Sequence, residues 1–476
     1  MSILCNRQCT YFKIMSNLGK TEKDLIKSRK NKRAKLEAAG VDCYPAKSER
    51  NYTVKKVLAA KEEFIAGGEN LTLAGRITAM RGHGAIIFAD LVDESGKLQL
   101  LFKNDTLGKD YKLLEFLDVG DFLQVFGKLF ITKAGETTLE VIRFKLLAKS
   151  LRPLPEKWHG LSDVESRYRE RYVDLIVNPK VKKLFYLRSK IITALRNFLV
   201  KNDFLEIDTP TLQPIAGGAV AKPFKTHYNA YNRDVFLRIA PELYHKRLIV
   251  GGFEKIFEFA RCFRNEGVDA SHNPEFTNLE FYWAYADYEK LMEFTEDLLR
   301  AVVKDVFGRE DIEIAGKKIN FSKDFKRLTF DKLTDGKNTD EAFKFAVKKI
   351  IEPTFVIDHP IDISPLAKRK NQKSVERFQL ILGGLEVINA FSELNDPIEQ
   401  EERFKEQVKL REKGREEAHM YDEDFVRALE YGMPPTAGWG LGVDRFVMLL
   451  CGAKTLREIL LFPYMKPEEE IEVYGH

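Results

Sequence analysis

The chain has 476 residues, enough for two or three domains that each bury a hydrophobic core. Its 44% hydrophobic and 31% charged residues are an ordinary balance for a soluble globular protein, and a net charge of +5 excludes a global polycation. The five cysteines form no CxxC pair, so neither a zinc site nor a disulfide framework is indicated, and a reducing, cytoplasmic location is expected. No apolar run approaches the roughly 18 residues that a membrane span requires.

The N-terminal residues 1–50 are expected to be a basic extension that contains a helix. Residues 1–14 lack the apolar core of a signal peptide, and Met15 is a candidate for the true initiator. A threonine start signal, strong helix formers and a glycine stop predict a helix from Thr21 to Gly40. Its basic side chains form either a solvated face or a phosphate-contacting surface for RNA, and both interpretations remain open. They are Lys23, Lys27, Arg29, Lys30, Lys32, Arg33 and Lys35.

Residues 51–150 have the pattern of a small all-β domain. Turns that contain glycine separate five strand candidates, and a short helix, 107–117, is expected between the third and the fourth. The strands are expected at residues 71–78, 85–93, 97–103, 121–132 and 137–147. This is the layout of an OB-fold barrel, which binds single-stranded nucleic acid on its second and third strands by stacking bases on aromatic rings.

A linker is expected at residues 151–175, where Pro153 and Pro155 stiffen the chain, and a second domain at 176–476. That domain begins with an amphipathic helix at 180–201 and a strand at 204–209. A glycine-containing loop then ends at Gly218, where the backbone can approach a ligand closely. Glu242 lies at the start of a further helix. Residues 304–373 are more charged and less regular, and are expected to be a partly helical insertion.

The most informative stretch, residues 263–288, reads FRNEGVDASHNPEFTNLEFYWAYADY. It predicts an antiparallel hairpin whose strands, 253–264 and 276–284, are joined by a polar loop. Because side chains alternate across a strand, one face is expected to be core, with Leu279, Phe281 and Trp283. The other face carries polar groups that an ordinary half-buried strand does not require, together with Phe276: Asn278, Glu280 and Tyr282.

Two later stretches have similar features. In ERFQLILGGLEVINAFSELNDP, residues 376–397, strand-like runs flank a Gly-Gly pair, and Asn389, Phe391 and Glu393 share one face. Glu386 is out of phase with Asn389, so a bulge or a different strand boundary is needed to bring both to one site. The sequence GWGLGVDR, residues 438–445, leads into an apolar helix at 446–450.

These stretches resemble the three signature motifs of the class II aminoacyl-tRNA synthetases. Residues 180–210 resemble the first motif, residues 263–288 the second and residues 438–450 the third; FRNEG followed by HNPEFT is similar to the lysine-specific members. The resemblance covers roughly residue 50 to the C-terminus. It implies an α+β architecture, in which an OB-fold anticodon-binding domain precedes an antiparallel catalytic sheet flanked by helices. It also implies a homodimer built through the first motif.

The resemblance implies ATP-dependent activation of L-lysine to lysyl-adenylate and transfer of the lysyl group to the 3′ end of tRNA(Lys). ATP is then a co-substrate and Mg²⁺ a cofactor, and no membrane or DNA partner is expected. An aspartate or asparagine enzyme is disfavoured, because Glu280 and Glu393 would repel those substrates. A lysine-activating paralogue that modifies a protein would typically lack the barrel. A catalytically weakened or idle paralogue that binds RNA is the remaining alternative.

Site residues follow from the same resemblance. Arg264 and Arg445 are the expected catalytic residues. Arg264 is expected at the α-phosphate, since a guanidinium fork can hold phosphate and carboxylate oxygens together. Arg445 and Phe276 match the two groups that sandwich adenine in the resembled family. The expected lysine-binding residues are Gly218, Glu242, Glu280, Tyr282, Asn389, Phe391 and Glu393. The expected ATP-binding residues are Arg264, Glu266, His272, Asn273, Phe276, Glu386, Gly442 and Arg445. The expected anticodon-binding residues are Phe88, Gln99 and Glu136.

Glu386 and Gln379 are the expected metal ligands, and here the sequence departs from the family. Gln379 stands where the family usually has a second metal-binding glutamate, so one negative charge is missing. A glutamine carbonyl oxygen can still bind Mg²⁺. Retained activity with fewer or weaker metal sites is therefore expected. Ser271 also stands where some relatives have a basic residue, which predicts a weaker hold of that loop on phosphate.

Overall fold

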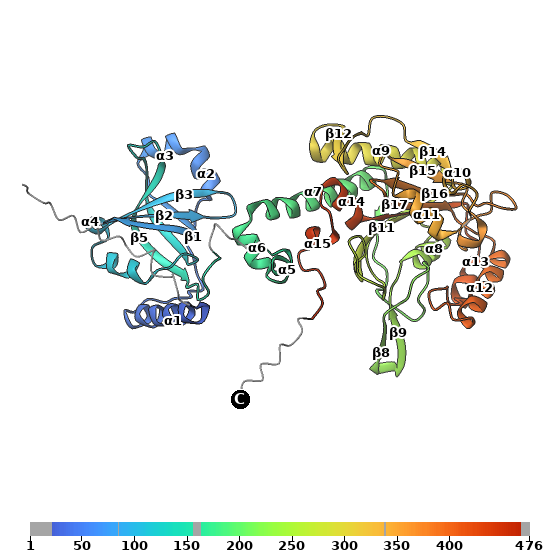
Figure 1. The fold of residues 1–476 in the computed structure, drawn as a ribbon, viewed down its shortest axis with the longest axis horizontal. Coiled ribbons are helices and arrows are strands. Elements are labelled where there is room, and N and C mark those ends of the chain that lie inside the picture. Colours follow the sequence, from blue (N-terminus) through green and yellow to red (C-terminus); the bar gives the residue numbers. More distant parts are fainter. Residues whose placement is uncertain (1–20, 84, 156–162, 338, 468–476) are drawn as a thin grey trace, which may run out of the picture. The chain divides into compact units, whose positions relative to one another are not determined.

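The computed structural model describes residues 21–83, 85–155, 163–337 and 339–467. The chain forms two compact units, residues 1–160 and 161–476 (Figure 1). The candidate initiator Met15 lies outside the described residues. Within them, no helix is long and apolar enough to cross a membrane.

The first unit contains a closed five-stranded barrel with the strand order β1-β2-β3-β5-β4. Every second side chain of a strand faces the interior, which buried residues such as Leu73, Leu100 and Val125 fill. The expected five strands, and a helix after the third, are therefore confirmed. The elements are β1 (Leu71–His83), β2 (Ile86–Val92), β3 (Lys97–Lys103), α4 (Asn104–Leu107), the 3₁₀ helix η2 (Gly108–Phe116), β4 (Phe122–Ile131) and β5 (Thr137–Ala148).

Three helices precede the barrel: α1 (Glu22–Ala38), α2 (Val54–Ala59) and α3 (Lys61–Gly67). The side chains of Thr21 and Asp24 form a capping box that begins α1. Arg29 donates to the carbonyl oxygens of Ser150 and Val119 at 3.1 and 3.0 Å, and Lys32 pairs with Asp118 at 2.7 Å. Two of the basic residues of α1 therefore hold the helix against the barrel, while Lys23, Lys27 and Lys30 are exposed.

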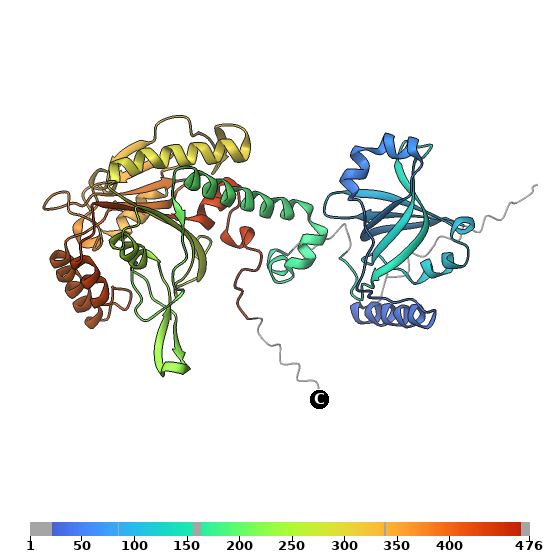
Figure 2. The same ribbon diagram turned by 180° about the vertical axis from the view of Figure 1, so that it is seen from behind.

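The second unit is built on an eight-stranded sheet with the order β14-β15-β16-β17-β18-β11-β10-β6 (Figures 1 and 2). The neighbours from β15 to β10 pair antiparallel, and the two edge strands, β14 and β6, run parallel to their neighbours. The strands are β6 (Leu205–Glu206), β10 (Lys255–Phe263), β11 (Glu275–Ala284), β14 (Lys326–Thr329), β15 (Thr354–Ile357), β16 (Arg377–Leu382), β17 (Leu385–Ser392) and β18 (Thr436–Gly442).

Helices cover both faces of this sheet. On one face, α7 (Pro179–Lys201), α9 (Tyr288–Phe307) and α14 (Val443–Leu450) pack on strand residues such as Phe281 and Trp439 to form the main core. On the other face, α8 (Glu242–Val250), α12 (Pro397–Glu412) and α13 (Glu423–Glu430) enclose a second cluster around Phe404 and Phe425. Polar side chains gather on this second face, beside the second cluster.

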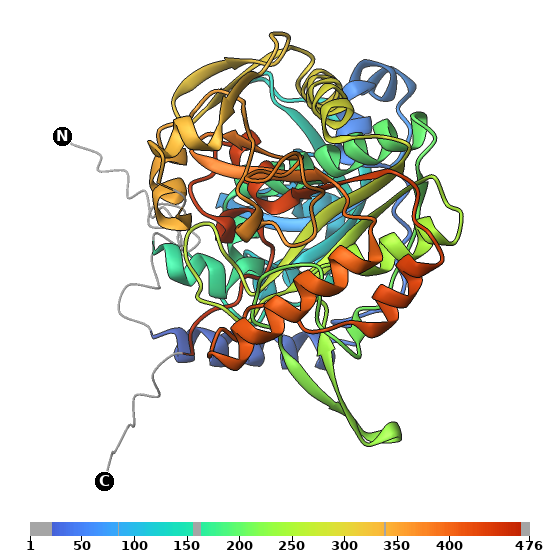
Figure 3. The same cartoon turned by 90° about the vertical axis from the view of Figure 1, so that its right-hand side faces the viewer.

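Residues 304–373, expected to be an insertion, supply β14 and β15 to the main sheet. Both strands have only four residues, too few for a clear period-two pattern. The same region contains the small β12–β13 hairpin, and a separate hairpin, β8–β9, projects from the unit (Figure 3). The other elements are α5 (Val164–Arg169), α6 (Arg171–Val177), β7 (Leu212–Gln213), β8 (Lys225–Tyr228), η3 (Asn229–Tyr231), β9 (Arg233–Leu237), β12 (Asp311–Ile314), β13 (Lys317–Asn320), α10 (Phe330–Thr334), α11 (Asp340–Val347), η4 (Ile361–Ile363) and α15 (Leu456–Ile459).

Candidate active site

A cavity of about 450 Å³ opens on the second face of the large sheet. Strands β11, β16, β17 and β18, the start of α8, the β10–β11 loop and the segment 363–367 line it. Every expected lysine- or ATP-binding residue lines this cavity except Glu393, which is buried behind Gly438 and Tyr282. Segment 363–367 was missed, because its residues belong to the region expected to carry little function.

The cavity exists because glycines face it from β18. Asn278, Glu280 and Tyr282 of β11 pair with Gly442, Gly440 and Gly438. The intervening Trp439 lies in the main core, as do Leu279 and Phe281. Alternate positions of β18 therefore place no side chain on the polar face of the sheet. The predicted division of β11 into a core face and a polar face is confirmed.

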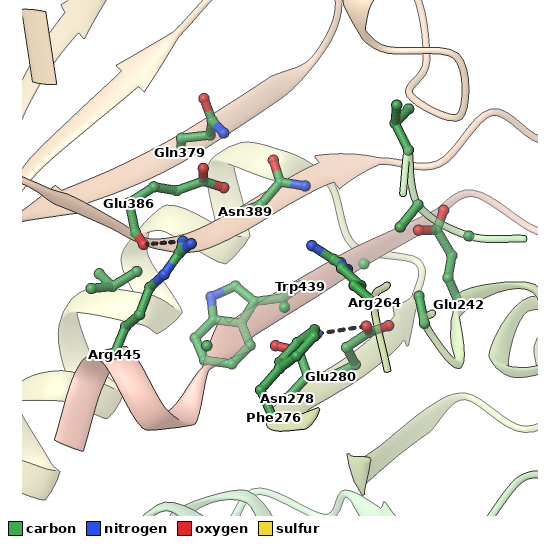
Figure 4. Close-up of a pocket in the computed structure, with 18 of the residues that line it drawn as sticks. Glu242, Arg264, Phe276, Asn278, Glu280, Gln379, Glu386, Asn389, Trp439 and Arg445 are labelled. Carbon is green, nitrogen blue, oxygen red and sulfur yellow. Dashed lines mark hydrogen bonds between the residues drawn. The ribbon is translucent and has the colours of Figure 1, made fainter. Parts of the chain in front are cut away.

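A bulge brings Glu386 and Asn389 to the same cavity. The pairing of β16 with β17 shifts register between Leu380 and Ile381, so that Ile381 pairs with Glu386 and Leu380 with Ile388. Val387 is the extra residue, and it lies in the core cluster together with Ile388. The predicted need for an irregularity in this strand is confirmed. Glu386 and Asn389 stand near each other on the far side of the cavity in Figure 4.

Three buried carboxylates define one end of the cavity: Glu242, Glu280 and Glu393. Asn278 Nδ2 donates to Glu280 Oε1 at 2.8 Å (Figure 4). Burial, followed by the charge of Glu242, raises the pKa of Glu280 to about 8. Burial also raises the pKa of Glu393 well above its usual range. Such a group of acids favours ligands that bring positive charge.

Lys246, which the sequence analysis missed, is also buried at this end. Its Nζ lies 2.7 Å from Oε1 of Glu242 and pairs with Oε2 of Glu393. Burial opposes its charge, but the two carboxylates raise the pKa of Lys246 above its ordinary value, so it remains an ammonium. The spacing of Glu242 and Lys246, four residues apart at the start of a helix, is a sequence signal that could have revealed this pair.

A second buried network lies behind the carboxylates. Glu258 on β10 accepts from Arg238 at 2.5 Å, from Thr209 at 2.6 Å and contacts His245 Nε2 at 2.9 Å. The ring of His245 packs edge-on against that of Tyr282, with centroids 5.1 Å apart. These groups join β10, α8 and β11 and so support Tyr282 from behind.

Two arginines lie farther along the cavity, with Arg264 between the carboxylates and Arg445, and Arg445 at the opposite end (Figure 4). The guanidinium of Arg264 lies 5.0 Å from the centre of the Phe276 ring. Arg445 donates to the carbonyl oxygens of Glu386 and Ser271 at 3.2 and 3.3 Å. Gly442 lines the cavity wall beside Arg445. In the loop between β10 and β11, Glu266 accepts from the backbone N–H of Lys222 at 3.4 Å, and Asn273 donates to the carbonyl oxygen of Glu275 at 2.6 Å.

His272 links Arg445 to the loop between β10 and β11. Arg445 Nη2 lies 2.8 Å from His272 Nε2, and Asp269 lies 2.8 Å from His272 Nδ1. Since a guanidinium can only donate, His272 accepts at Nε2 and donates from Nδ1 to Asp269. The hydroxyl of Ser271, which also lines the cavity, donates to Asp269 as well, at 3.1 Å.

The metal ligands expected from the sequence fit unequally. Glu386 presents a carboxylate to the cavity. The carbonyl oxygen of Gln379 accepts instead from Nε2–H of buried His359 at 2.8 Å. Burial and nearby Arg377 lower the pKa of His359 to about 3, which keeps this imidazole neutral. Within the described ranges, no three His, Cys, Asp or Glu side chains are grouped to hold a metal.

In the barrel, the three expected anticodon residues lie on or beside the second and third strands. Phe88 of β2 is half-buried and absent from the core cluster, whereas its neighbours Ile87 and Ala89 point inward. Gln99 of β3 accepts from the hydroxyl of Thr138 at 2.8 Å. Glu136 is exposed in the turn between β4 and β5. The outer face of β2 and β3 therefore presents the ring of Phe88 and the amide of Gln99, and Glu136 lies in the turn that leads into β5, the strand paired with β3.

Comparison with known proteins agrees with this architecture. Residues 163–466 match the family model of the class II tRNA synthetases (D, K and N), and residues 71–154 match the OB-fold nucleic acid binding domain. The chain belongs to the class II tRNA synthetases.

Among its curated relatives, the lysine–tRNA ligase of Carboxydothermus hydrogenoformans is 48% identical, over 94% of this chain and 99% of that protein. The lysine–tRNA ligase of Pelotomaculum thermopropionicum is 47% identical over 94% and 96%. That of Roseiflexus castenholzii is 45% identical over 94% and 99%.

Proposed function

We propose that this chain is a lysine–tRNA ligase, which activates L-lysine with ATP and transfers the lysyl group to the 3′ end of tRNA(Lys). The relatives that carry this name match it over nearly their whole length. The observation that carries the substrate assignment is the group of three buried carboxylates, Glu242, Glu280 and Glu393, against one buried ammonium. Nothing supports an idle paralogue that binds RNA.

The charge at this end of the cavity favours a diamino acid. Glu242 is assigned to the α-ammonium, and Glu393 with Tyr282 to the ε-ammonium. A buried carboxylate is costly unless a cation pairs with it, and the two ammonium groups of lysine supply such cations. Aspartate would bring a like charge, and asparagine would leave the acids without partners. Gly218, Asn389 and Phe391 complete the assigned subsite.

Adenylate formation requires the lysine carboxylate to attack the α-phosphate of ATP. A bond forms between a carboxylate oxygen and phosphorus, and the bond from phosphorus to the bridging oxygen breaks, releasing pyrophosphate. The nucleophile is already an anion, so catalysis rests on positioning and on neutralising charge. Arg264, between the carboxylate cluster and Arg445 in Figure 4, is assigned to the α-phosphate. Phe276 and Arg445 are assigned to adenine, and His272 to the terminal phosphates.

A magnesium ion is the proposed cofactor. Glu386 would hold it with its carboxylate, and Gln379 could add only the second lone pair of a neutral carbonyl oxygen that already accepts from His359. When bound, Mg²⁺ neutralises charge on the phosphate oxygens, which provide most of its ligands. The remaining nucleotide contacts are assigned to Glu266, Asn273 and Gly442.

The second step needs tRNA, and we assign its anticodon to the outer face of β2 and β3. Phe88 offers a ring for stacking, and Gln99 and Glu136 offer hydrogen bonds. A homodimer is proposed through α7 and β6, because β6 is the edge strand of the large sheet and Val200 and Leu205 are exposed apolar residues there. The proposed location is the cytoplasm, and neither DNA nor a membrane is a proposed partner.

The test is amino-acid-dependent exchange of pyrophosphate into ATP, measured for each standard amino acid with and without tRNA. Exchange with lysine alone, independent of tRNA, is expected. Phe88→Ala is the matched control, because it should leave this exchange unchanged and reduce only the charging of tRNA(Lys). No exchange with any amino acid, combined with retained RNA binding, would replace the proposal with the idle paralogue.

A further inference from the structure

Lys246 is a buried ammonium for which the steps above provide no role. It is completely buried on α8, and its Nζ lies 5.6 Å from the ring centre of Phe391 and 5.8 Å from that of Phe425. Removing an ammonium from water is expensive, so such a group is retained only where paired carboxylates offset the cost. Here both partners, Glu242 and Glu393, are assigned to the substrate's two ammonium groups.

The two carboxylates come from unrelated parts of the fold. Glu242 begins α8, and Glu393 follows β17 and is bridged to Ala367. Local backbone geometry therefore does not set the separation of their carboxylates, and like charges would drive them apart. Contact of one Nζ with an oxygen of each holds them within a few ångströms of each other.

This bridge leaves part of each acid for a ligand. Lys246 uses Oε1 of Glu242, whose side chain also lines the cavity, and Oε2 of Glu393. The other oxygen of Glu393, Oε1, is buried without a hydrogen-bond partner among the described residues and lies beside Gly438 and Tyr282. An unpartnered buried carboxylate oxygen at the assigned ε-ammonium position is an acceptor that awaits a donor.

We propose that Lys246 is a positioning residue for amino-acid recognition, whose ammonium clamps the carboxylates of Glu242 and Glu393 at the separation that matches the two ammonium groups of lysine. This proposal rests on the proposed lysine specificity. A diamino acid with a side chain one methylene shorter, ornithine, then reaches only one acid at a time. The clamp thereby sets chain-length selectivity, which charge alone does not provide.

The clamp also affects the pH at which lysine binds. The positive charge of Lys246 lowers the pKa of both acids against the larger, opposing effect of burial. Without it, the acids hold their protons to higher pH and stop accepting an ammonium at low pH. Glu242, Glu393 and His419 interact with the charge of Lys246 itself. Glu280, Tyr282 and Arg377 interact with the two acids.

The experiment compares wild type with Lys246→Met, which has nearly the same length and no charge, in pyrophosphate exchange with lysine and with ornithine across pH. For Lys246→Met, the KM for lysine should rise at least about tenfold, since truncating one partner of a buried charge pair is costly. The preference for lysine over ornithine should fall by about tenfold, and the acidic limb of kcat/KM for lysine should move to higher pH. The KM for ATP should stay within about twofold of wild type.

Lys149→Met is the matched control. Lys149 is a buried lysine between two acids, Asp118 at 2.5 Å and Asp121 at 2.8 Å, but it belongs to the barrel. Its loss should leave the lysine KM and the preference over ornithine unchanged. If Lys149→Met alters that preference as Lys246→Met does, the effect is a general cost of removing a buried lysine and the proposal fails.

A Lys246→Met protein with wild-type lysine KM, wild-type preference and an unmoved pH profile overturns the clamp while leaving the ligase activity in place. Absence of lysine-dependent exchange in wild type instead removes the proposed function. If Lys246→Met does not fold, Lys246→Arg decides, because it keeps the charge but replaces a point-like ammonium with a planar fork. A folded Lys246→Arg with reduced preference supports the clamp, and one with unchanged preference overturns it.

Discussion

Replacing Gly438 by alanine tests whether the position of Glu393 controls lysine activation. A Cβ at this position would lie 2.6 Å from Cε1 of Tyr282 and closer still to Oε1 of Glu393. Carbon atoms need about 3.5 Å for a favourable contact, so the ring has to retreat by roughly 1 Å and the carboxylate by more. Both neighbours are fully buried, so neither can swing into solvent.

The displacement disturbs the ion pair between Glu393 and Lys246, and a misplacement of about 1 Å at a reacting centre can cost roughly 100-fold in rate. We therefore expect kcat/KM for lysine in pyrophosphate exchange to fall about 100-fold in Gly438→Ala, equivalent to about 2.7 kcal/mol. The KM for ATP should change little, because the nucleotide end of the cavity is untouched. Circular dichroism should show a folded protein.

Gly440→Ala provides the comparison on the same strand. A Cβ there would meet nothing closer than 3.5 Å, the distance to Cγ of Glu280, which is ordinary contact. We expect a loss below about tenfold in kcat/KM for lysine. If Gly440→Ala costs as much as Gly438→Ala, the methyl group acts by filling the cavity and not by displacing Glu393. A Gly438→Ala enzyme within threefold of wild type would refute the reasoning altogether.

Three further predictions concern pH, stability and metal use. The pKa of Glu280 is about 8 in the folded protein and has its ordinary value of 4.5 in the unfolded chain. Between pH 4.5 and about pH 8 the folded state therefore binds more protons than the unfolded state, and the unfolding free energy falls as the pH rises through this range. Glu280→Gln should remove up to about 1.4 kcal/mol per pH unit of this slope in urea denaturation, and an unchanged slope would contradict the assignment. Thr295→Val removes the acceptor of the Trp439 indole N–H, 2.9 Å away in the core, and should lower the unfolding free energy by about 1–3 kcal/mol; a loss below about 0.5 kcal/mol would argue against that bond. Gln379→Glu should lower the Mg²⁺ concentration needed for half-maximal pyrophosphate exchange. It should also increase Mn²⁺ binding measured by electron paramagnetic resonance in the presence of a non-hydrolysable ATP analogue. No change in either quantity would show that residue 379 does not contact the metal.

Local sequence patterns were enough to predict much of this fold. Alternation along β11 separated Glu280 from Phe281, and the five strands of the barrel followed from short apolar runs between glycine turns. The phase mismatch between Glu386 and Asn389 predicted an irregular strand, and the bulge at Val387 supplies it. In each case the signal lies within about ten residues of the feature.

Contacts between distant segments were not predictable in this way. The pairing of Lys246 with Glu393 spans β17 and α8, and the hydrogen bond from His359 to Gln379 depends on how β15 and its following loop pack on β16. The strands β14 and β15 were absorbed into an expected insertion, because four residues are too few to show a period. Resemblance to the class II synthetases supplied the roles assigned to individual site residues.

The extra residue at Val387 has a consequence for how this strand tolerates mutation. In a regular strand, odd positions face one side of the sheet and even positions the other along the whole strand. The residues that line a cavity are therefore restricted to every second position from one end of the strand to the other. The bulge resets that parity between Glu386 and Asn389. A saturation scan along residues 385–392 should therefore show two short alternating tolerance profiles, offset by one position. Substitutions on the Glu386 side of the bulge and those on the Asn389 side can then accumulate independently.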